Sequence, residues 1–171
     1  MKVETLVILF LVIFILHEFE EIIFFKSWLN KNMEEITERF PQFARKVLPH
    51  WQSLSTSFFT LAVAEEFLIL SVVSIYAVIF QEYQLWFALF VGFSVHLIFH
   101  IIQWILYKKY IPCIASTLLV FPICIYIFVR FNQMEILDLK EQCLWGIFGV
   151  IFSILNLVAV HLLLNKIDLK L

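Results

Sequence analysis

The sequence predicts an all-α membrane protein, a polytopic bundle of about five transmembrane helices. Hydrophobic residues make up 63% of the 171 positions and charged residues only 15%, which is more apolar surface than a water-soluble domain can bury. Apolar stretches also recur at the length of about 20 residues with which a helix crosses a hydrocarbon core. Because no repeat or low-complexity tract divides these stretches, we expect one helical bundle domain over residues 1–171.

The predicted spans fall in five places. They are residues 3–26, 54–80, 85–107, 111–130 and 143–165. The first could be a signal peptide, since Lys2 precedes a short apolar run. However, no small-residue cleavage site follows, and the apolar run resumes at Ile22. We therefore expect a retained first span.

The connection after the first span, about residues 27–53, is predicted to contain helix that lies on the membrane surface. Asn32 is placed to cap a short helix, with Glu35 three residues later, and Phe43 and Trp51 offer apolar anchors. A flexible loop is the alternative.

The orientation follows from the lysines and arginines, because positive residues are retained on the cytoplasmic side. Nine of the 12 lie on one side of the predicted bundle, in the first connection, the third connection and the C-terminal tail. The other side has Lys2, Arg130 and Lys140. We therefore expect the N-terminus outside, the C-terminus in the cytoplasm, and a multi-pass protein of the cell membrane.

Composition also argues against two other classes of protein. The net charge is −2 and no basic run is present, so the sequence does not predict a nucleic-acid partner. The three cysteines, Cys113, Cys124 and Cys143, lack metal-ligand spacing and are odd in number, so we expect buried thiols and neither disulfides nor a zinc knuckle.

Acids and histidines inside the predicted spans are the unusual feature. They are His17, Glu18, Glu20, Glu21, Glu65, Glu66, His96, His100 and His161. An ionised side chain near the bilayer centre costs roughly 2.5–3.5 kcal/mol. These side chains must therefore face one another, be neutral, or bind something.

Helical spacing predicts which of these side chains face one another. His17, Glu20 and Glu21 stand at i, i+3 and i+4 and share a face, whereas Glu18 points about 100° away from His17 and is expected at the rim. On the other helices the predicted inward residues are His96, His100, Gln103, His161, Asn156, and Glu66 in preference to Glu65. Glu66 is preferred because it is in line with small residues that pack between helices.

The stretch His17-Glu18-Phe19-Glu20-Glu21 resembles the signature of the HXXEE family of small bacterial and archaeal membrane proteins. The likeness extends through residues 60–70 and 96–128 and to an Asn/His element near the C-terminus. In that element Asn156 and His161 are one residue further apart than in the family's pattern. The resemblance implies a helical membrane fold and an active site at the motif, and it names no substrate.

The favoured interpretation is a metal-dependent enzyme acting on a lipid-like substrate that enters from the membrane. A divalent cation would offset the buried negative charge, with zinc suited to hydrolysis and iron or manganese to a carboxylate-rich centre and oxidation. The candidate metal ligands are His17, Glu20, Glu21, Glu66, His96, His100 and His161; the candidate catalytic acids are Glu20, Glu21, Glu65 and Glu66. Gln103 and Asn156 are candidate substrate-pocket residues, although Asn156 could instead join two helices.

Two other functions remain open on the sequence. The first is metal-free proton transfer between glutamate and histidine, as an isomerase of a lipid or sterol-like molecule would need. The second is a proton-coupled carrier or ion-binding sensor, because chains of acids and histidines also relay protons.

Overall fold

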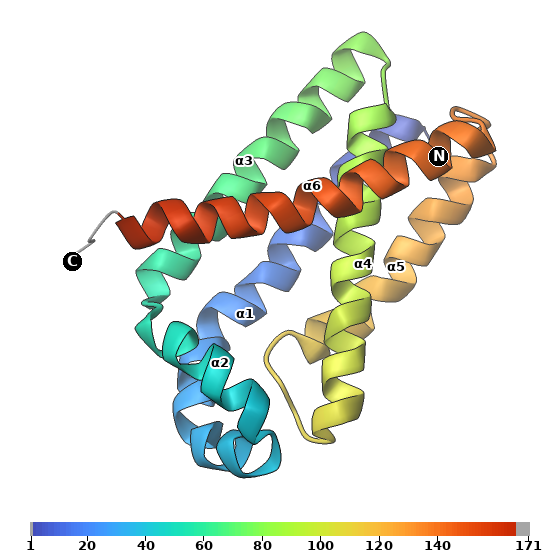
Figure 1. Cartoon of the computed structure of the whole chain (residues 1–171). Coiled ribbons are helices and arrows are strands. Elements are labelled where there is room, and N and C mark those ends of the chain that lie inside the picture. Colours follow the sequence, from blue (N-terminus) through green and yellow to red (C-terminus); the bar gives the residue numbers. More distant parts are fainter. Residues whose placement is uncertain (1, 167–171) are drawn as a thin grey trace.

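The computed structural model describes residues 2–166, with the side chains of all of them except residues 161 and 164–166. This part of the chain forms six helices and no strand (Figure 1). The helices are α1 (Val3–Arg39), α2 (Pro41–Ser53), α3 (Thr56–Phe80), α4 (Gln84–Tyr107), α5 (Ile114–Asn132) and α6 (Leu139–Lys166). The all-α prediction is confirmed.

Four of these helices, α3, α4, α5 and α6, are long and apolar enough to cross a membrane. They correspond to the second to fifth predicted spans. Helix α1 is not among the four, although it begins where the first predicted span begins. It is 37 residues long, and the acids from Glu18 to Glu21 interrupt its apolar sequence.

The start of a separate helix at Asn32 was a wrong prediction. Helix α1 continues through this position, and Asn32 Nδ2 donates a hydrogen bond to the carbonyl of Trp28 at 2.8 Å. No glycine or proline occurs between the first span and Pro41, so nothing stops the helix before that proline. The break falls at Phe40, and Pro41 then occupies the first turn of α2, where its missing N–H costs nothing.

Helix α2, in the connection where the sequence predicts interfacial helix, is amphipathic and packs back on α1. It buries Ala44 and Leu48 while Phe43 stays 45% exposed. The Lys26 ammonium of α1 donates hydrogen bonds to the carbonyls of Gln52 and Leu54, at 2.7 and 2.8 Å. Since helix-end carbonyls lack intrahelical donors, Lys26 fixes the end of α2 against α1.

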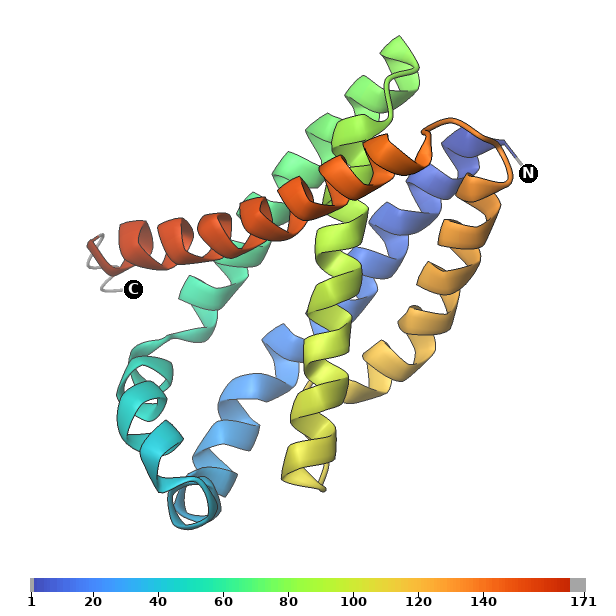
Figure 2. The same ribbon diagram turned by 45° about the vertical axis from the view of Figure 1, so that its right-hand side comes forward.

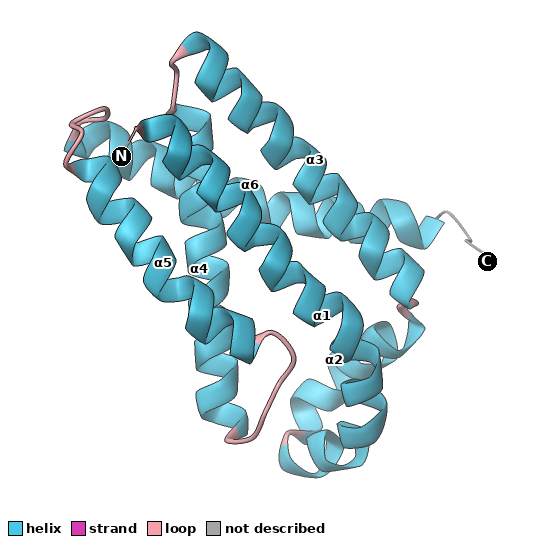
Figure 3. Cartoon of the chain, turned by 180° about the vertical axis from the view of Figure 1, so that it is seen from behind, coloured by secondary structure: helices cyan, strands magenta, loops and turns pink. Residues whose placement is uncertain are grey.

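The end of α1 also contacts the loop between α4 and α5, which is the long pink connection in Figure 3. Trp28 Nε1 donates to the carbonyl of Tyr110 at 2.9 Å, and Lys109 lies 2.8 Å from the Glu35 carboxylate. The hydrogen bond from Lys109, together with one from Arg39, lowers the pKa of Glu35 below its usual value. The first and third connections therefore lie at the same end of the bundle, as the topology predicted.

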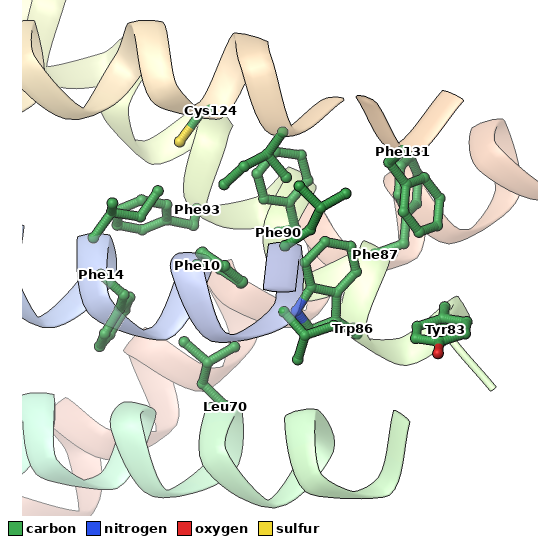
Figure 4. Packing of buried hydrophobic residues seen from close by; sticks show 14 of the residues in the cluster. Phe10, Phe14, Leu70, Tyr83, Trp86, Phe87, Phe90, Phe93, Cys124 and Phe131 are labelled. Carbon is green, nitrogen blue, oxygen red and sulfur yellow. The ribbon is translucent and has the colours of Figure 1, made fainter. Parts of the chain in front are cut away.

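Aromatic residues fill the other half of the bundle, towards the N-terminus of α1 (Figure 4). The ring of Phe10 lies 5.9 Å from that of Trp86 and 5.4 Å from that of Phe90, both edge-on. On the outside, apolar side chains such as Leu68 and Ile79 are 63% and 66% exposed. Apolar residues on the outer surface and polar residues in the interior suit a protein whose solvent is lipid.

Helix α6 runs diagonally across α4 (Figures 1 and 2). Small residues make this crossing possible, because Gly149 of α6 lies against the backbone of Ala88, and Gly92 of α4 lies against Ser153. Close backbone approach at small residues is the usual way in which helices pack in a membrane.

Candidate metal centre

Three histidines from two helices meet inside the bundle. His17 of α1 is fully buried, and its ring centroid lies 5.6 Å from that of His96 and 5.2 Å from that of His100, both on α4. The Nε2 atoms of His96 and His100 are 2.7 Å apart. Residues that are 79 positions apart in the sequence thus form one group of imidazoles.

One carboxylate completes this group. His17, Glu21, His96 and His100 each offer a ligand atom, and these four atoms all lie within 4.8 Å of one another. We call these four residues the His/Glu cluster. Each helix contributes a pair at i and i+4, the spacing that places two side chains on the same face of a helix.

The imidazole of His17 is held by the first turn of α5. His17 Nδ1 lies 3.0 Å from Ser116 Oγ, and that hydroxyl donates its own hydrogen to the carbonyl of Cys113 at 3.1 Å. The hydroxyl therefore accepts from Nδ1–H of His17, and the lone pair of His17 is on Nε2. His17 Nε2 is buried and has no hydrogen-bond partner in the described part of the chain.

His100 is held in a similar way within α4. Its Nδ1 lies 3.1 Å from the amide oxygen of Gln103 and 3.0 Å from the thiol of Cys113. Since an amide oxygen only accepts, Nδ1 of His100 carries the proton and Nε2 presents a lone pair towards His96. Histidines that bind metals through one nitrogen commonly donate from the other to such an outer partner.

Glu20 of the motif faces α5 and is not part of the His/Glu cluster. Its carboxylate accepts hydrogen bonds from the backbone N–H groups of Ser116, at 2.6 Å, and Ala115, at 3.4 Å, and from the Tyr110 hydroxyl at 2.8 Å. The N-cap residue of α5, Cys113, makes no side-chain capping bond. A carboxylate from α1 thus caps a different helix, where it also meets the positive end of the helix dipole.

The phenol of Tyr110 contributes to the same contact. Burial and the hydrogen bond to Glu20 raise the pKa of Tyr110 above its usual value, so the phenol remains a donor. Ser116, Cys113 and Tyr110 were not predicted as site residues. The only signal in the sequence is a serine near the start of the fourth predicted span, which is common at helix starts and does not by itself indicate a site.

Glu18 is buried, so its predicted position at the rim was wrong. Its exposed fraction is 4%, and it lies one turn from Phe14, whose ring stacks on that of Phe67 at 6.3 Å. This side of α1 therefore faces α3. Glu66, predicted as a metal ligand, is partly exposed and is not among the four residues of the His/Glu cluster, whereas Glu65 accepts a hydrogen bond from Asn156 of α6 at 3.1 Å.

The remaining predicted site residues are placed as follows. Gln103 contacts His100 directly, Asn156 joins α6 to α3, and the side chain of His161 lies outside the described residues. The structure thus brings together one of the two motif glutamates with all three described histidines of the predicted site. Three imidazoles and a carboxylate are a donor set that suits zinc and other first-row divalent metals.

The fold and the site define a class of protein: a helical membrane protein with a histidine and carboxylate site inside its bundle. Residues 8–127 match the family described as "protein of unknown function with HXXEE motif", and the chain belongs to this family. The resemblance seen in the sequence is thereby confirmed. The match includes the motif from His17 to Glu21 and both α4 histidines, and it ends before Asn156. No curated protein and no solved structure matches the chain.

Proposed function

We propose that the chain is a metal-dependent membrane enzyme that hydrolyses a lipid-like substrate. The observation that carries this proposal is the His/Glu cluster, four ligand atoms within 4.8 Å of one another on two helices. Two of its histidines have Nδ1 engaged by outer partners, which directs the Nε2 lone pairs inward. The orphaned Nε2 of His17 has no role in packing but would have one as a ligand.

The reaction type follows from the donor set. Three histidines supply the ligands of a typical catalytic zinc site, which leaves one position for water. Metal binding lowers the pKa of such a water molecule to near 7 and makes hydroxide available for attack on an ester or amide carbonyl. Glu21 would then either complete the coordination or accept the proton of that water.

The substrate class rests on where the cluster lies. The surrounding helices present apolar side chains to the outside, and Glu21 and His96 are partly exposed while His17 and His100 are buried. A molecule that reaches this site from the bilayer must itself be lipid-like. The apolar outer surface around the His/Glu cluster therefore favours an enzyme that acts on membrane lipid over one that acts on a water-soluble substrate.

We further propose that α1 supplies a fifth span, with the N-terminus outside, in the cell membrane. Leu6 and Phe10 of α1 are buried against neighbouring helices, while Ile8 is 60% exposed, as on the other spans. A reporter enzyme fused to the C-terminus should be active only inside the cell. Activity outside the cell would refute the orientation.

The test of the metal site is elemental analysis of the protein purified in detergent. We expect stoichiometric zinc, iron or manganese that both His17→Ala and His100→Ala remove. The matched control is His50→Ala, which changes a histidine outside the cluster and should retain the metal. Protein that is metal-free and remains so after incubation with each metal would refute the proposal.

The test of the reaction is hydrolysis of ester lipids in vesicles. The metal-loaded protein should release fatty acid from them. If the protein binds metal but releases no fatty acid, hydrolysis of such esters is refuted.

A further inference from the structure

Glu20 is the glutamate of the HXXEE motif that lies outside the His/Glu cluster. Its neighbour Glu21 offers a ligand atom to the cluster. The Glu20 carboxylate instead accepts hydrogen bonds at the start of α5 and in the loop before it, from Tyr110, Ala115 and Ser116. The acceptor at the start of a helix usually comes from the helix's own N-cap residue. A cap supplied by α1 also fixes the position of α5 relative to α1.

Ser116 is bonded to α1 at two points. Its backbone N–H donates to Glu20 at 2.6 Å, and its hydroxyl oxygen lies 3.0 Å from Nδ1 of His17. His17 and Glu20 stand three positions apart and therefore lie on the same side of α1. One serine thus joins the motif glutamate to the motif histidine, through its backbone at one point and its side chain at the other. A displacement of this backbone would displace the hydroxyl that holds His17.

The same turn contacts the second buried histidine of the cluster. The Ser116 hydroxyl donates to the carbonyl of Cys113 at 3.1 Å, and the sulfur of Cys113 lies 3.0 Å from Nδ1 of His100. We call residues 113–116 the α5 cap turn. The Nδ1 atoms of His17 and His100 both lie against this turn, which leaves the Nε2 atoms of both for the cluster.

The α5 cap turn requires contacts from outside, because part of its backbone is in an unfavourable conformation. Cys113 has a φ of 75°, in the left-handed region that residues other than glycine rarely adopt. Such a conformation persists only where surrounding contacts hold it. Cys113 makes no side-chain capping bond, and the Glu20 carboxylate supplies the acceptors for the free N–H groups of the turn.

We propose that Glu20 is a positioning residue for the metal of the His/Glu cluster. Its carboxylate fixes the α5 cap turn against α1, and the turn in turn orients His17 and His100 through their Nδ1 atoms. The inference rests on the proposed function, because it assumes that the cluster holds a metal. The two adjacent glutamates of the motif then differ in role. Glu21 offers a ligand atom, whereas Glu20 acts through Ser116 and does not touch the metal.

The test is zinc affinity, measured on the full-length protein in detergent by competition with a chelator. Outer partners of metal-binding histidines commonly change affinity by about 10–100-fold, and Glu20 acts one step further out. We therefore expect Glu20→Ala to bind Zn²⁺ about 10-fold more weakly than the wild type. Glu20→Gln should keep most of the affinity, because its amide oxygen can still accept from the Ser116 N–H.

The matched control is Ser55→Ala, which removes the cap of a helix that contributes no residue to the cluster. The Ser55 hydroxyl accepts from the backbone N–H of Phe58 at the start of α3, at 3.0 Å. Ser55→Ala should destabilise the bundle and leave zinc affinity unchanged. An equal loss of affinity in Ser55→Ala and Glu20→Ala would overturn the inference, because destabilisation alone would then explain both.

A double-mutant cycle tests the route from Glu20 to the metal. If Glu20 acts through Ser116, Glu20→Ala should weaken zinc binding little further in a chain that already carries Ser116→Ala. Losses that multiply in full would overturn the inference, because the two residues would then act independently.

The remaining outcomes separate this inference from the proposed function. A wild type that binds Zn²⁺ no more tightly than Glu20→Ala would overturn the positioning role and leave the His/Glu cluster standing. A wild type that binds no Zn²⁺ would overturn the positioning role, and the proposed function falls with it if iron and manganese also fail to bind. If Glu20→Ala does not fold, Glu20→Asp decides, since it keeps the charge but is one methylene shorter. Unchanged zinc affinity in Glu20→Asp would overturn the inference.

Discussion

Gly149, at the crossing of α4 and α6, allows a prediction that does not depend on the proposed function. A Cβ added at this glycine would lie 2.5 Å from the carbonyl carbon of Ala88 and 2.8 Å from its Cα, with the carbonyl oxygen closer still. Carbon atoms in good contact are about 3.5–4.0 Å apart. In Gly149→Ala the backbones must therefore separate by about 1 Å, because no flexible side chain can move aside.

The magnitude follows from comparison with Gly146→Ala on the same helix. A Cβ at Gly146 would lie 3.5 Å from Val91 Cγ1, an ordinary contact. Both substitutions gain about 1 kcal/mol of intrinsic helix preference, which cancels between them. The difference then reports the overpacking at Gly149, which we expect to lower the free energy of unfolding by about 1–3 kcal/mol.

The assay is unfolding by SDS titration in detergent micelles, followed by circular dichroism, with both variants and the wild type in parallel. We expect Gly146→Ala to be as stable as the wild type or slightly more so, and Gly149→Ala to unfold at lower SDS. Since α6 also carries Asn156, which bonds Glu65, the separation should disturb that hydrogen bond as well. Equal stability of the two variants would refute the close approach of α6 to α4.

Three other substitutions test contacts around the site. Ser116→Ala should weaken metal binding by about 10–100-fold, because His17 loses the hydrogen-bond partner of its Nδ1, whereas Ser116→Thr keeps the hydroxyl and most of the affinity. The measurement is a competition titration against a chelator. Unchanged affinity in Ser116→Ala would contradict the role of Ser116 in holding His17. Glu20→Gln should lower the free energy of unfolding by about 1 kcal/mol, since α5 loses a charged cap. If the variant unfolds thermally at the same temperature as the wild type, Glu20 does not stabilise the start of α5. Glu35→Gln should be less stable than the wild type at neutral pH. The pKa of Glu35 is lowered in the folded state by Lys109, so this contribution is present above the ordinary pKa and is lost as the pH falls through the lowered value. The free energies of unfolding of the wild type and Glu35→Gln should therefore become equal below about pH 4. A difference that stays constant with pH would exclude the Glu35–Lys109 ion pair as its cause.

Much of the architecture could be predicted because lipid imposes simple rules on sequence. Apolar stretches of span length predicted four of the helices to within about four residues at each end, and helical spacing predicted that histidines and acids would meet inside the bundle, as His17, Glu21, His96 and His100 do. The predicted start of a separate helix at Asn32 was wrong for a local reason. Residues that cap helices well can also lie in the interior of a helix, as Asn32 does, and α1 ends only where Pro41 follows.

Glu18 and Glu20 show where prediction from the sequence ends. Helical periodicity fixes the angles between side chains on one helix, so the pairs His17/Glu21 and His96/His100 could be predicted. It does not fix how that helix is rotated against its neighbours. Helix α1 has partners on several sides. Glu18, expected at the rim, is buried, and of the two glutamates expected in the site Glu21 joins the histidines while Glu20 caps α5.

By itself, then, the sequence determined a helical membrane bundle, its family, and the side chains that must avoid lipid, because hydrophobicity, length and motif spacing are local properties of the chain. Only the tertiary structure decided that Ser116 holds His17, that Gly149 brings α6 against α4, and that Glu18 is buried. Each of these depends on the rotation and separation of two helices. The packing of the whole bundle sets both, and the sequence of one helix sets neither.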